Sequence, residues 1–181
     1  MVHPRRLAFP LVFLCCCYFS SSACKCSGPG TVKASFDKAS VVFTGTVLRI
    51  EYHGLSETID PDSLALARSL PHEGSKNFLD TPVVLKAIMV VTNDFKGVTK
   101  SDTVVVYTGI RGATCGFKFE PGKEYTVYAA TESYMYSFYR LDRPRFRGFG
   151  RKGTYWTSIC SRTTIAVGQE QGLLNEHLGR K

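Results

Sequence analysis

The run Ser40-Val-Val-Phe-Thr-Gly-Thr-Val-Leu-Arg-Ile-Glu-Tyr52 has the composition of a long β-strand in this 181-residue chain. β-branched and aromatic residues, which pack well on a pleated surface, dominate it. Three similar runs and one weaker run follow it, at residues 82–92, 103–108, 124–129 and 154–160. Five short strands in one chain predict a mainly β fold. Because closure protects strand edges, we expect a five-stranded closed antiparallel barrel.

Turn residues separate these predicted strands. The runs Asn93-Asp94-Phe95-Lys96-Gly97 and Glu120-Pro121-Gly122-Lys123 are typical of hairpin connections. Gly45 lies inside the first predicted strand, where a glycine suits a bulge or a sharp bend. The sequence therefore predicts tight connections and one irregular strand.

Helical signals are few and lie at the edges of the strand pattern. Residues 34–39 predict a short helical turn, and residues 169–178 carry Leu174 and Leu178 at helical spacing. Residues 53–81 form a long insertion that contains a helix-like run at 62–70. We expect short helices that flank the barrel, and the insertion is either functional or disordered.

Composition bounds the class of protein. The hydrophobic content of 44%, the charged content of 21% and the mean hydropathy of -0.06 are values of a globular chain. They exclude a disordered, collagenous or membrane-embedded protein, and the length fits one domain. Seven cysteines and a net charge of +8 are unusual. An odd cysteine count does not suit a disulfide framework, so processing must be considered first.

The first 23 residues have the layout of a secretory signal peptide. Arg5 and Arg6 precede an apolar run at residues 7–19, and small residues at 20–23 predict cleavage before Cys24. The run is shorter than the roughly 20 residues that a membrane anchor needs. We therefore expect a secreted protein of the extracellular space or matrix, with one mature domain at residues 24–181 and no transmembrane segment. Its net charge is +6, because two arginines are removed.

Cleavage leaves an even set of cysteines, Cys24, Cys26, Cys115 and Cys160. Disulfides form in the oxidising compartment to which a secreted chain travels. A Cys24–Cys26 bond would close a very short loop with unfavourable geometry, which leaves two long-range pairings. Either pairing fastens the amino terminus to the body of the domain. In an alternative interpretation Cys24 is the lipid-modified cysteine of a lipoprotein, although Ser21 stands where an apolar residue is expected.

Catalytic signatures are absent from the sequence. There is no H-E-x-x-H or G-x-S-x-G motif, and the four histidines are scattered. Residues 148–153 match G-x-G-x-x-G, but no strand precedes them and no helix follows, so we treat the match as chance. We expect neither an enzyme nor a metal or cofactor site of the chain's own.

The predicted mature chain begins Cys24-Lys25-Cys26-Ser27-Gly28-Pro29, and here it resembles the tissue inhibitors of metalloproteinases and the wider netrin-module family. The amino-terminal domain of that family starts with Cys-x-Cys directly after the signal peptide. Further blocks of the chain are similar to the family's strands, turn and later cysteine blocks, namely residues 42–47, 95–97, 115–125 and 160–163. The resemblance spans residues 24–178.

The resemblance implies a fold and a disulfide pairing. The fold is a five-stranded Greek-key barrel of the oligonucleotide/oligosaccharide-binding (OB) type with flanking short helices. The implied pairs are Cys24–Cys115 and Cys26–Cys160. The two disulfides would link the predicted amino-terminal segment covalently to two other parts of the domain.

The resemblance also implies an inhibitory mechanism. The free α-amino group and carbonyl of Cys24 would chelate the catalytic zinc of a secreted or cell-surface metalloproteinase, so that the zinc comes from the target. Lys25 would enter the pocket for the residue after the scissile bond, and Ser27 would extend the contact behind Cys26. Gly112 and Ala113 would form a second contact loop. In the alternative interpretation the two disulfides only staple the domain, and Gly112 and Ala113 form an ordinary hairpin tip.

The sequence departs from the family pattern at several places. Inhibitory members usually carry Thr or Ser where this chain has Lys25, and an ammonium in an apolar pocket is costly if unpaired. Phe36 stands near the position of a cysteine of a third disulfide, and the carboxyl-terminal six-cysteine domain is missing. We expect a single-module relative whose inhibition of proteases with deep apolar pockets is weakened.

A basic loop at residues 137–153 suggests a second function. Its six cations face one acid, Asp142, so that its net charge is +5, and the cations are Arg140, Arg143, Arg145, Arg147, Arg151 and Lys152. Arginine suits sulfate groups, and a secreted protein meets sulfated polysaccharide more often than nucleic acid. The alternative function is a non-inhibitory netrin-like module that binds heparin-like glycans or matrix. A merely solvated loop is the third interpretation.

Overall fold

The computed structural model describes Cys24, Cys26, Gly28 and residues 30–59, 61–69, 79–98, 102–110, 114–132 and 153–180. The predicted signal segment lies outside the described residues. So do Lys25, Ser27, Gly112, Ala113 and the cations of the basic loop, Arg140, Arg143, Arg145, Arg147, Arg151 and Lys152.

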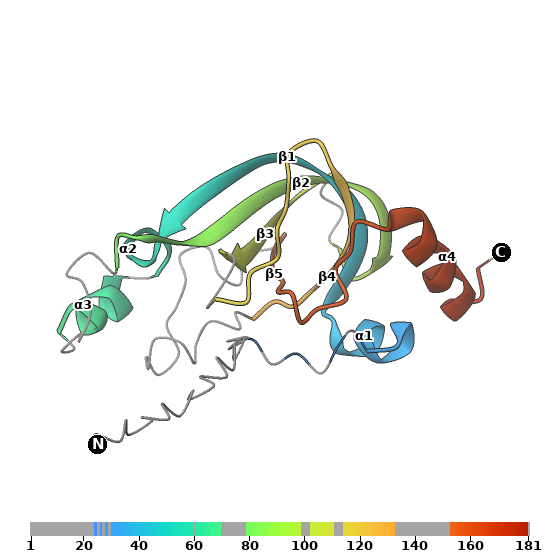
Figure 1. Cartoon of the computed structure of the whole chain (residues 1–181), viewed down its shortest axis with the longest axis horizontal. Helices are drawn as coiled ribbons and strands as arrows, with labels where there is room; N and C mark the ends of the chain where they lie inside the picture. Colours follow the sequence, from blue (N-terminus) through green and yellow to red (C-terminus); the bar gives the residue numbers. More distant parts are fainter. Residues whose placement is uncertain are drawn as a thin grey trace, which may run out of the picture.

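Five strands form a single twisted sheet (Figure 1). They are β1 (Val41–Gly54), β2 (Pro82–Lys96), β3 (Thr103–Gly109), β4 (Glu124–Ala129) and β5 (Thr154–Trp156), in the order β4-β1-β2-β3-β5. Three neighbouring pairs are antiparallel, and the β3–β5 pair is parallel. The expectation of a mainly β fold with five strands is confirmed.

The expectation of an antiparallel sheet throughout is wrong, because β5 lies parallel to β3. A parallel pair needs a long crossover, and the chain that includes β4 supplies it. The sheet is also not closed. Its edge strands meet at one isolated bridge, where Ala130 and Trp156 exchange two backbone hydrogen bonds of 2.8 and 2.7 Å.

The fifth strand is shorter than its sequence predicts. It ends at Trp156, and residues 158–161 turn instead, with the Ser161 amide donating to the Ser158 carbonyl at 3.0 Å. The Ser161 hydroxyl also accepts from the Ser158 amide. These local hydrogen bonds compete with strand pairing, so β5 is too short to close the sheet.

The two predicted hairpin turns differ from expectation. Residues 93–96 belong to β2, because the strand stays paired with β1 as far as the Val42–Lys96 pair. The second turn does form at Pro121 and Gly122, but it joins no hairpin, since β3 and β4 are not paired. It enters β4 beside β1, where the Gly122 amide donates to the Val47 carbonyl.

The bulge predicted at Gly45 is confirmed, because the β1–β2 register shifts between Thr44 and Gly45. A Cβ atom at this position would lie 2.7 Å from the Val90 carbonyl oxygen. Glycine therefore permits the close approach of the two strands. The main core takes residues from all five strands, and its buried residues include Phe43, Val47, Met89, Val106, Phe119, Tyr125, Val127 and Tyr155.

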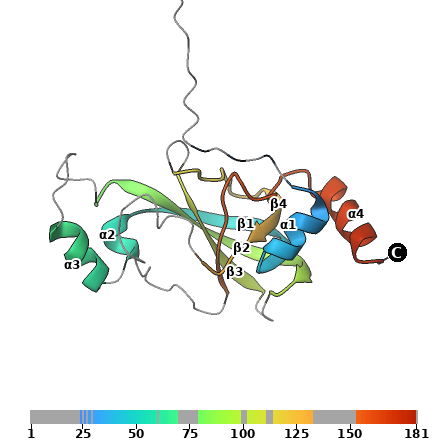
Figure 2. The ribbon, with the colours of Figure 1, turned by 90° about the horizontal axis from the view of Figure 1, so that it is seen from below.

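The four helices in the described residues lie at two ends of the sheet (Figure 2). The helices α2 (Leu55–Thr58) and α3 (Pro61–Ser69) lie at one end, and α1 (Val32–Lys38) and α4 (Val167–His177) lie together at the other (Figure 1). The expected flanking helices are thus present, and the helix in the insertion forms α3. No helix in the described part of the chain is long and apolar enough to cross a membrane.

A second apolar cluster fastens α1 and α4 to the sheet. It joins Val42, Phe95, Tyr128 and Leu174, with Phe36 packed against it. The ring of Phe36 lies 5.3 Å from the His177 ring and 5.1 Å from the Lys96 ammonium. Packing therefore joins α1 to α4 and to the end of β2.

Candidate functional site

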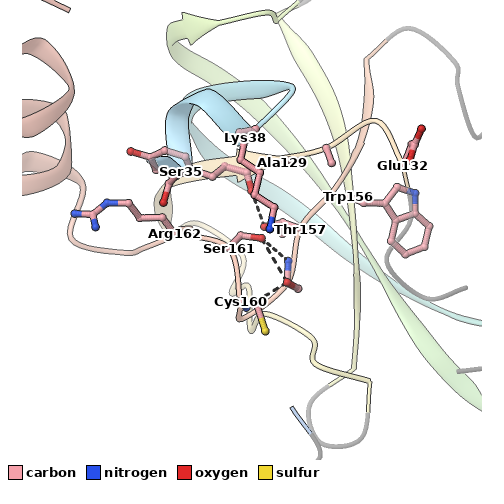
Figure 3. A pocket seen from close by; sticks show the side chains of 13 residues that line it. Ser35, Lys38, Ala129, Glu132, Trp156, Thr157, Cys160, Ser161 and Arg162 are labelled. Atoms are coloured by element: carbon pink, nitrogen blue, oxygen red, sulfur yellow. Dashed lines mark hydrogen bonds between the residues drawn. The ribbon is translucent and has the colours of Figure 1, made fainter. Parts of the chain in front are cut away.

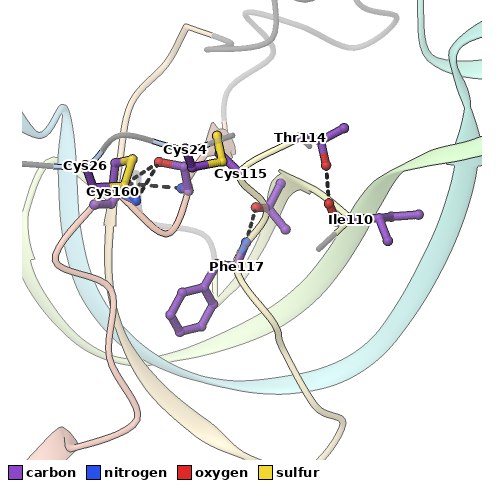
Figure 4. The surroundings of a disulfide bond; sticks show 10 residues. Cys24, Cys26, Ile110, Thr114, Cys115, Phe117 and Cys160 are labelled. Atoms are coloured by element: carbon purple, nitrogen blue, oxygen red, sulfur yellow. Dashed lines mark hydrogen bonds between the residues drawn. A yellow bond between two sulfur atoms is a disulfide. The ribbon is translucent and has the colours of Figure 1, made fainter. Parts of the chain in front are cut away.

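Two disulfides hold the segment that leads into α1. They join Cys24 to Cys115 and Cys26 to Cys160, with Cα–Cα distances of 5.6 and 5.1 Å (Figure 4). These are the pairs that the family resemblance implies, and they are one of the two long-range pairings left open by spacing. The chain-entropy model credits loops of this length with about 4–5 kcal/mol each. The segment around Cys24 is therefore anchored at two points.

The two anchoring segments contact each other directly. The Ile159 amide donates to the Cys115 carbonyl at 3.0 Å, so Cys115 and Cys160 belong to one hydrogen-bonded unit. The Cys160 amide in turn donates to the Ser158 hydroxyl at 3.2 Å. Cys24 and Cys26 are thus bonded to two neighbouring segments, the one around Cys115 and the one around Cys160. We call these two segments together the platform.

The Cys115 side of this platform is tied to the end of β3. The Phe117 amide donates to the Thr108 hydroxyl at 2.8 Å, and the Thr114 hydroxyl donates to the Ile110 carbonyl (Figure 4). Cys115 has a positive φ of 53°, and the backbone at Gly109 leaves no room for a side chain at Gly116. The platform depends on a tight backbone crossing at this place.

The Cys160 side is held by a partly buried ion pair that sequence reasoning missed. Arg162 donates to Glu170 from Nε at 2.5 Å and from a terminal nitrogen at 3.0 Å. Its other terminal nitrogen donates to the Gly30 carbonyl at 2.8 Å. Because Gly30 lies between Cys26 and α1, Arg162 ties the amino-terminal segment to α4.

Glu170 also accepts a hydrogen bond from the Tyr128 hydroxyl at 2.6 Å. Burial, and then the bond to the Glu170 carboxylate, raise the pKa of Tyr128 far above its usual range. The hydrogen bond to Glu170 likewise raises the pKa of Arg162. The network therefore keeps Arg162 charged and Tyr128 neutral. No periodic signal pairs Arg162 with Glu170 in the sequence.

Ile159 is a second residue that the sequence did not single out. The residue is 48% exposed, although it is apolar and adjoins Cys160. The sequence assigned it to the fifth strand, whereas the turn at residues 158–161 leaves it in solvent. Its place beside both disulfides gives the platform an apolar contact point.

The structure brings together only part of the predicted site. Cys24, Cys26, Cys115 and Cys160 converge, and all four are oxidised. Lys25, Ser27, Gly112 and Ala113, by contrast, lie outside the described residues. In the described ranges no group of three or more histidine, cysteine or acidic side chains could hold a metal ion.

The sulfurs of the four cysteines are bonded to one another, so they are not thiolate ligands for a metal. Comparison with known proteins adds no assignment, since neither a family model nor a curated protein matches the chain.

Proposed function

We propose that the mature chain is a secreted metalloproteinase inhibitor, and that the α-amino group and carbonyl of Cys24 chelate the catalytic zinc of its target. The observation that carries this proposal is the double attachment of the Cys24–Cys26 segment to adjacent parts of one platform. The ion pair of Arg162 adds a third attachment at Gly30. These attachments would hold the main-chain atoms of Cys24 in place, and those atoms are the proposed zinc ligands.

The chemistry of zinc suits these atoms. A catalytic zinc keeps one position open for water or substrate, and a neutral amine is a good nitrogen ligand. An α-amino group has a pKa of roughly 7.7–8.0, so losing its proton costs little near neutral pH. A terminus already held in place loses little conformational entropy when it binds. The chain acts as an inhibitor rather than an enzyme, and the zinc belongs to the partner.

The fold assignment belongs to the same proposal. The strand order β4-β1-β2-β3-β5, with one bridge between the edge strands, is compatible with a partly open barrel of the OB type. We assign the chain to that architecture as a single netrin-like module. The family resemblance and the cysteine pairs support the assignment.

The protease would contact the exposed edge around the disulfides. Lys25 and Ser27 flank Cys26 in the sequence, and Gly112 and Ala113 precede Cys115. We add the exposed Ile159 to this set, because it adjoins Cys160 and its amide is bonded to Cys115. Lys25 restricts the targets to proteases whose pocket tolerates an ammonium.

The decisive experiment compares two forms of the mature protein. One begins at Cys24, and the other carries one extra alanine before it, which removes the α-amine from Cys24 while leaving both disulfides intact. A panel of secreted and cell-surface zinc metalloproteinases is assayed with each form. We expect inhibition of at least one protease by the first form and none by the second. No inhibition by either form, with equal thermal unfolding, would overturn the proposal.

The second candidate function is binding of heparin-like glycans by the basic loop. Its support is a charge distribution in which residues 140–152 hold five of the mature chain's six net positive charges. Retention on a heparin column should fall with salt and be lost when Arg140, Arg143, Arg145 and Arg147 become alanine. Retention that is unchanged in that variant would refute this function.

A further inference from the structure

The strand β1 has a described neighbour on both sides only in its first half. β4 pairs with it from Val41 to Thr46, whereas β2 continues beside it as far as Gly54. Among the described residues, 48–53 therefore have a strand on one side only, and this half of β1 leads away from β4 toward α2 (Figure 1). We call the side of residues 48–53 that faces away from β2 the open edge. Unpaired backbone groups on such an edge can bind a further strand.

The outer border of β4, in contrast, is covered. The backbones of Thr126 and Thr164 exchange two hydrogen bonds of 2.9 Å, and the Thr157 hydroxyl donates to the Tyr128 carbonyl at 2.9 Å. Figure 3 shows Thr157 beside Ala129 at this border. Its backbone groups are already bonded within the domain, so this border offers no comparable place for a further strand.

Strand geometry determines which backbone groups face the open edge. The Ile110 amide donates to the Val83 carbonyl, so Val83 turns its backbone groups toward β3. The next residue of β2, which pairs with His53, turns toward β1, and His53 therefore turns toward β2. Because successive residues alternate, the amides and carbonyls of Ile50 and Tyr52 point to the open edge.

Exposed apolar side chains mark the same stretch. Leu48 is 55% exposed and Tyr52 is 58% exposed, and they are two of the five large apolar residues that are exposed in the described part of the chain. Ile50, which lies between them, packs against the main core and is partly buried. An added strand would cover apolar surface as well as backbone groups.

Opposite charges alternate with these apolar residues. Arg49 and Glu51 are neighbours on the strand, and the Arg49 Nε donates to the Glu51 carboxylate at 2.8 Å. Lys86 donates to the other carboxylate oxygen at 2.7 Å. The Arg49 side chain is exposed, and a guanidinium carries further donors besides Nε. The stretch thus presents one exposed cation and one carboxylate at a spacing of two residues.

We propose that the open edge pairs with the same edge of a second copy of the chain, in an antiparallel arrangement whose two-fold axis passes between the two Ile50 residues. The Ile50 residues then exchange backbone hydrogen bonds. Leu48 of each copy lies opposite Tyr52 of the other, and Arg49 lies opposite Glu51. Apolar pairs and opposite charges directly across two strands stabilise their pairing. Because each copy contributes the same residues, the contact has the self-complementarity that a symmetric dimer requires.

Neighbouring registers fit less well. An axis at Arg49 or at Glu51 would place two identical charges directly opposite each other, which is destabilising. An axis at Tyr52 would need the backbone of Gly54. The Gly54 amide, however, donates to a carboxylate of α2 at 3.4 Å, and its carbonyl accepts from a hydroxyl of α2 at 3.2 Å. Charge and available backbone groups together favour the register centred on Ile50.

The first test is sedimentation of the mature protein at rising concentration. A contact of one short strand pair is smaller than the roughly 1,000 Å² of a stable interface, so we expect a monomer–dimer equilibrium with a dissociation constant of about 10 µM or weaker. Association should fall as salt rises, because the paired charges are accessible to solvent. In amide hydrogen exchange, Ile50 and Tyr52 should become protected only at concentrations at which the dimer forms.

Charge reversal tests the register. Arg49→Glu and Glu51→Lys each place like charges opposite each other in the dimer, and each should weaken association at least tenfold. An equimolar mixture of the two variants should associate again, because each acid of one variant then lies opposite a cation of the other. Lys33→Glu, at an exposed lysine of α1, is the control for Arg49→Glu with the same change of charge, and it should dimerise like wild type.

Several results would overturn the proposal. A protein that stays monomeric while the Ile50 and Tyr52 amides are protected at every concentration would mean that another segment of the same chain covers the edge. A monomer in which both amides exchange freely would leave the edge to a different protein. A dimer that Arg49→Glu does not weaken, or a mixture of variants that does not associate, would exclude this register. Protease inhibition through Cys24 is assayed separately and does not depend on the outcome.

Discussion

Arg162 and Glu170 form a two-bond ion pair in which the side chain of Glu170 is only 7% exposed. The pair joins the segment after Cys160 to α4, and through the Gly30 carbonyl it also holds the chain between Cys26 and α1. Paired charges at this depth tolerate the loss of either partner poorly, because the other charge is left desolvated.

Replacing Arg162 with methionine should therefore lower the free energy of unfolding by about 3 kcal/mol. It should also weaken zinc-protease inhibition, because Gly30 loses its attachment. Urea unfolding and inhibition assays measure the two effects. Glu176→Gln is the matched control on the exposed side of α4 and should change neither quantity. A loss of stability with unchanged inhibition would assign Arg162 a purely structural role.

Removing the Cys26–Cys160 bond by replacing both cysteines with serine should lower the free energy of unfolding by about 4 kcal/mol. The bond closes a loop with a sequence separation of 134, and long loops gain most from a cross-link. Differential scanning calorimetry of the oxidised protein and the double variant measures the change. A variant that is equally stable would contradict the view that the terminus is held by this bond.

The charge cluster at the end of β1 should make stability depend on pH. The hydrogen bond from Lys86 at 2.7 Å, assisted by Arg49, lowers the pKa of Glu51 to about 2. A carboxyl whose pKa is lower in the folded state adds stability above its unfolded pKa, and this stability is lost as the pH falls toward 2. Because Glu51 is partly exposed, Glu51→Gln should cost only about 1 kcal/mol at pH 7.

The same comparison should show a much smaller difference between wild type and Glu51→Gln near pH 2, where the Glu51 carboxyl is half protonated in the folded state. Lys86→Met, alone and combined with Glu51→Gln, completes a double-mutant cycle that isolates the pair. Chemical unfolding across this pH range is the measurement. A difference that stays constant from pH 7 to pH 2 would show that Glu51 acts through packing rather than charge.

Two glycine-to-alanine substitutions should act in opposite directions. Gly45→Ala places a Cβ atom 2.7 Å from the Val90 carbonyl oxygen and should destabilise the protein by about 2 kcal/mol. Gly172→Ala meets nothing within 4 Å on α4 and should stabilise it by about 0.5 kcal/mol, because alanine favours the helix. Thermal unfolding of both variants tests the close approach of β1 and β2. Equal changes in stability for the two substitutions would contradict the close approach of β1 and β2 at Gly45.

Exchange of Lys25 for threonine should strengthen inhibition of proteases with deep apolar pockets, since it removes an ammonium that must be desolvated on binding. Inhibition constants for wild type and Lys25→Thr against such a protease measure the effect. Lys33→Thr, an exposed lysine of α1, is the matched control. Equal inhibition by wild type and Lys25→Thr would remove Lys25 from the proposed contact.

Local composition was enough to locate most strands. The first four runs are rich in β-branched or aromatic residues, and the structure has a strand over each. Gly45 and the short helices were likewise predictable, because backbone freedom and helical spacing are properties of neighbouring residues. The cysteine pairs needed the family resemblance, since spacing alone left two pairings open.

Contacts between residues that are distant in the sequence decided the features that local composition did not predict. Of the turn expected at residues 93–97, residues 93–96 are in β2, because Lys96 pairs with Val42, more than fifty positions earlier in the chain. β5 lies parallel to β3, and the Ser158–Ser161 turn cuts it short. The Arg162–Glu170 pair depends on where α4 docks, and Ile159 is exposed because it lies in that turn. Propensity acts over a few neighbouring residues, whereas strand pairing and buried charge depend on packing across the whole domain.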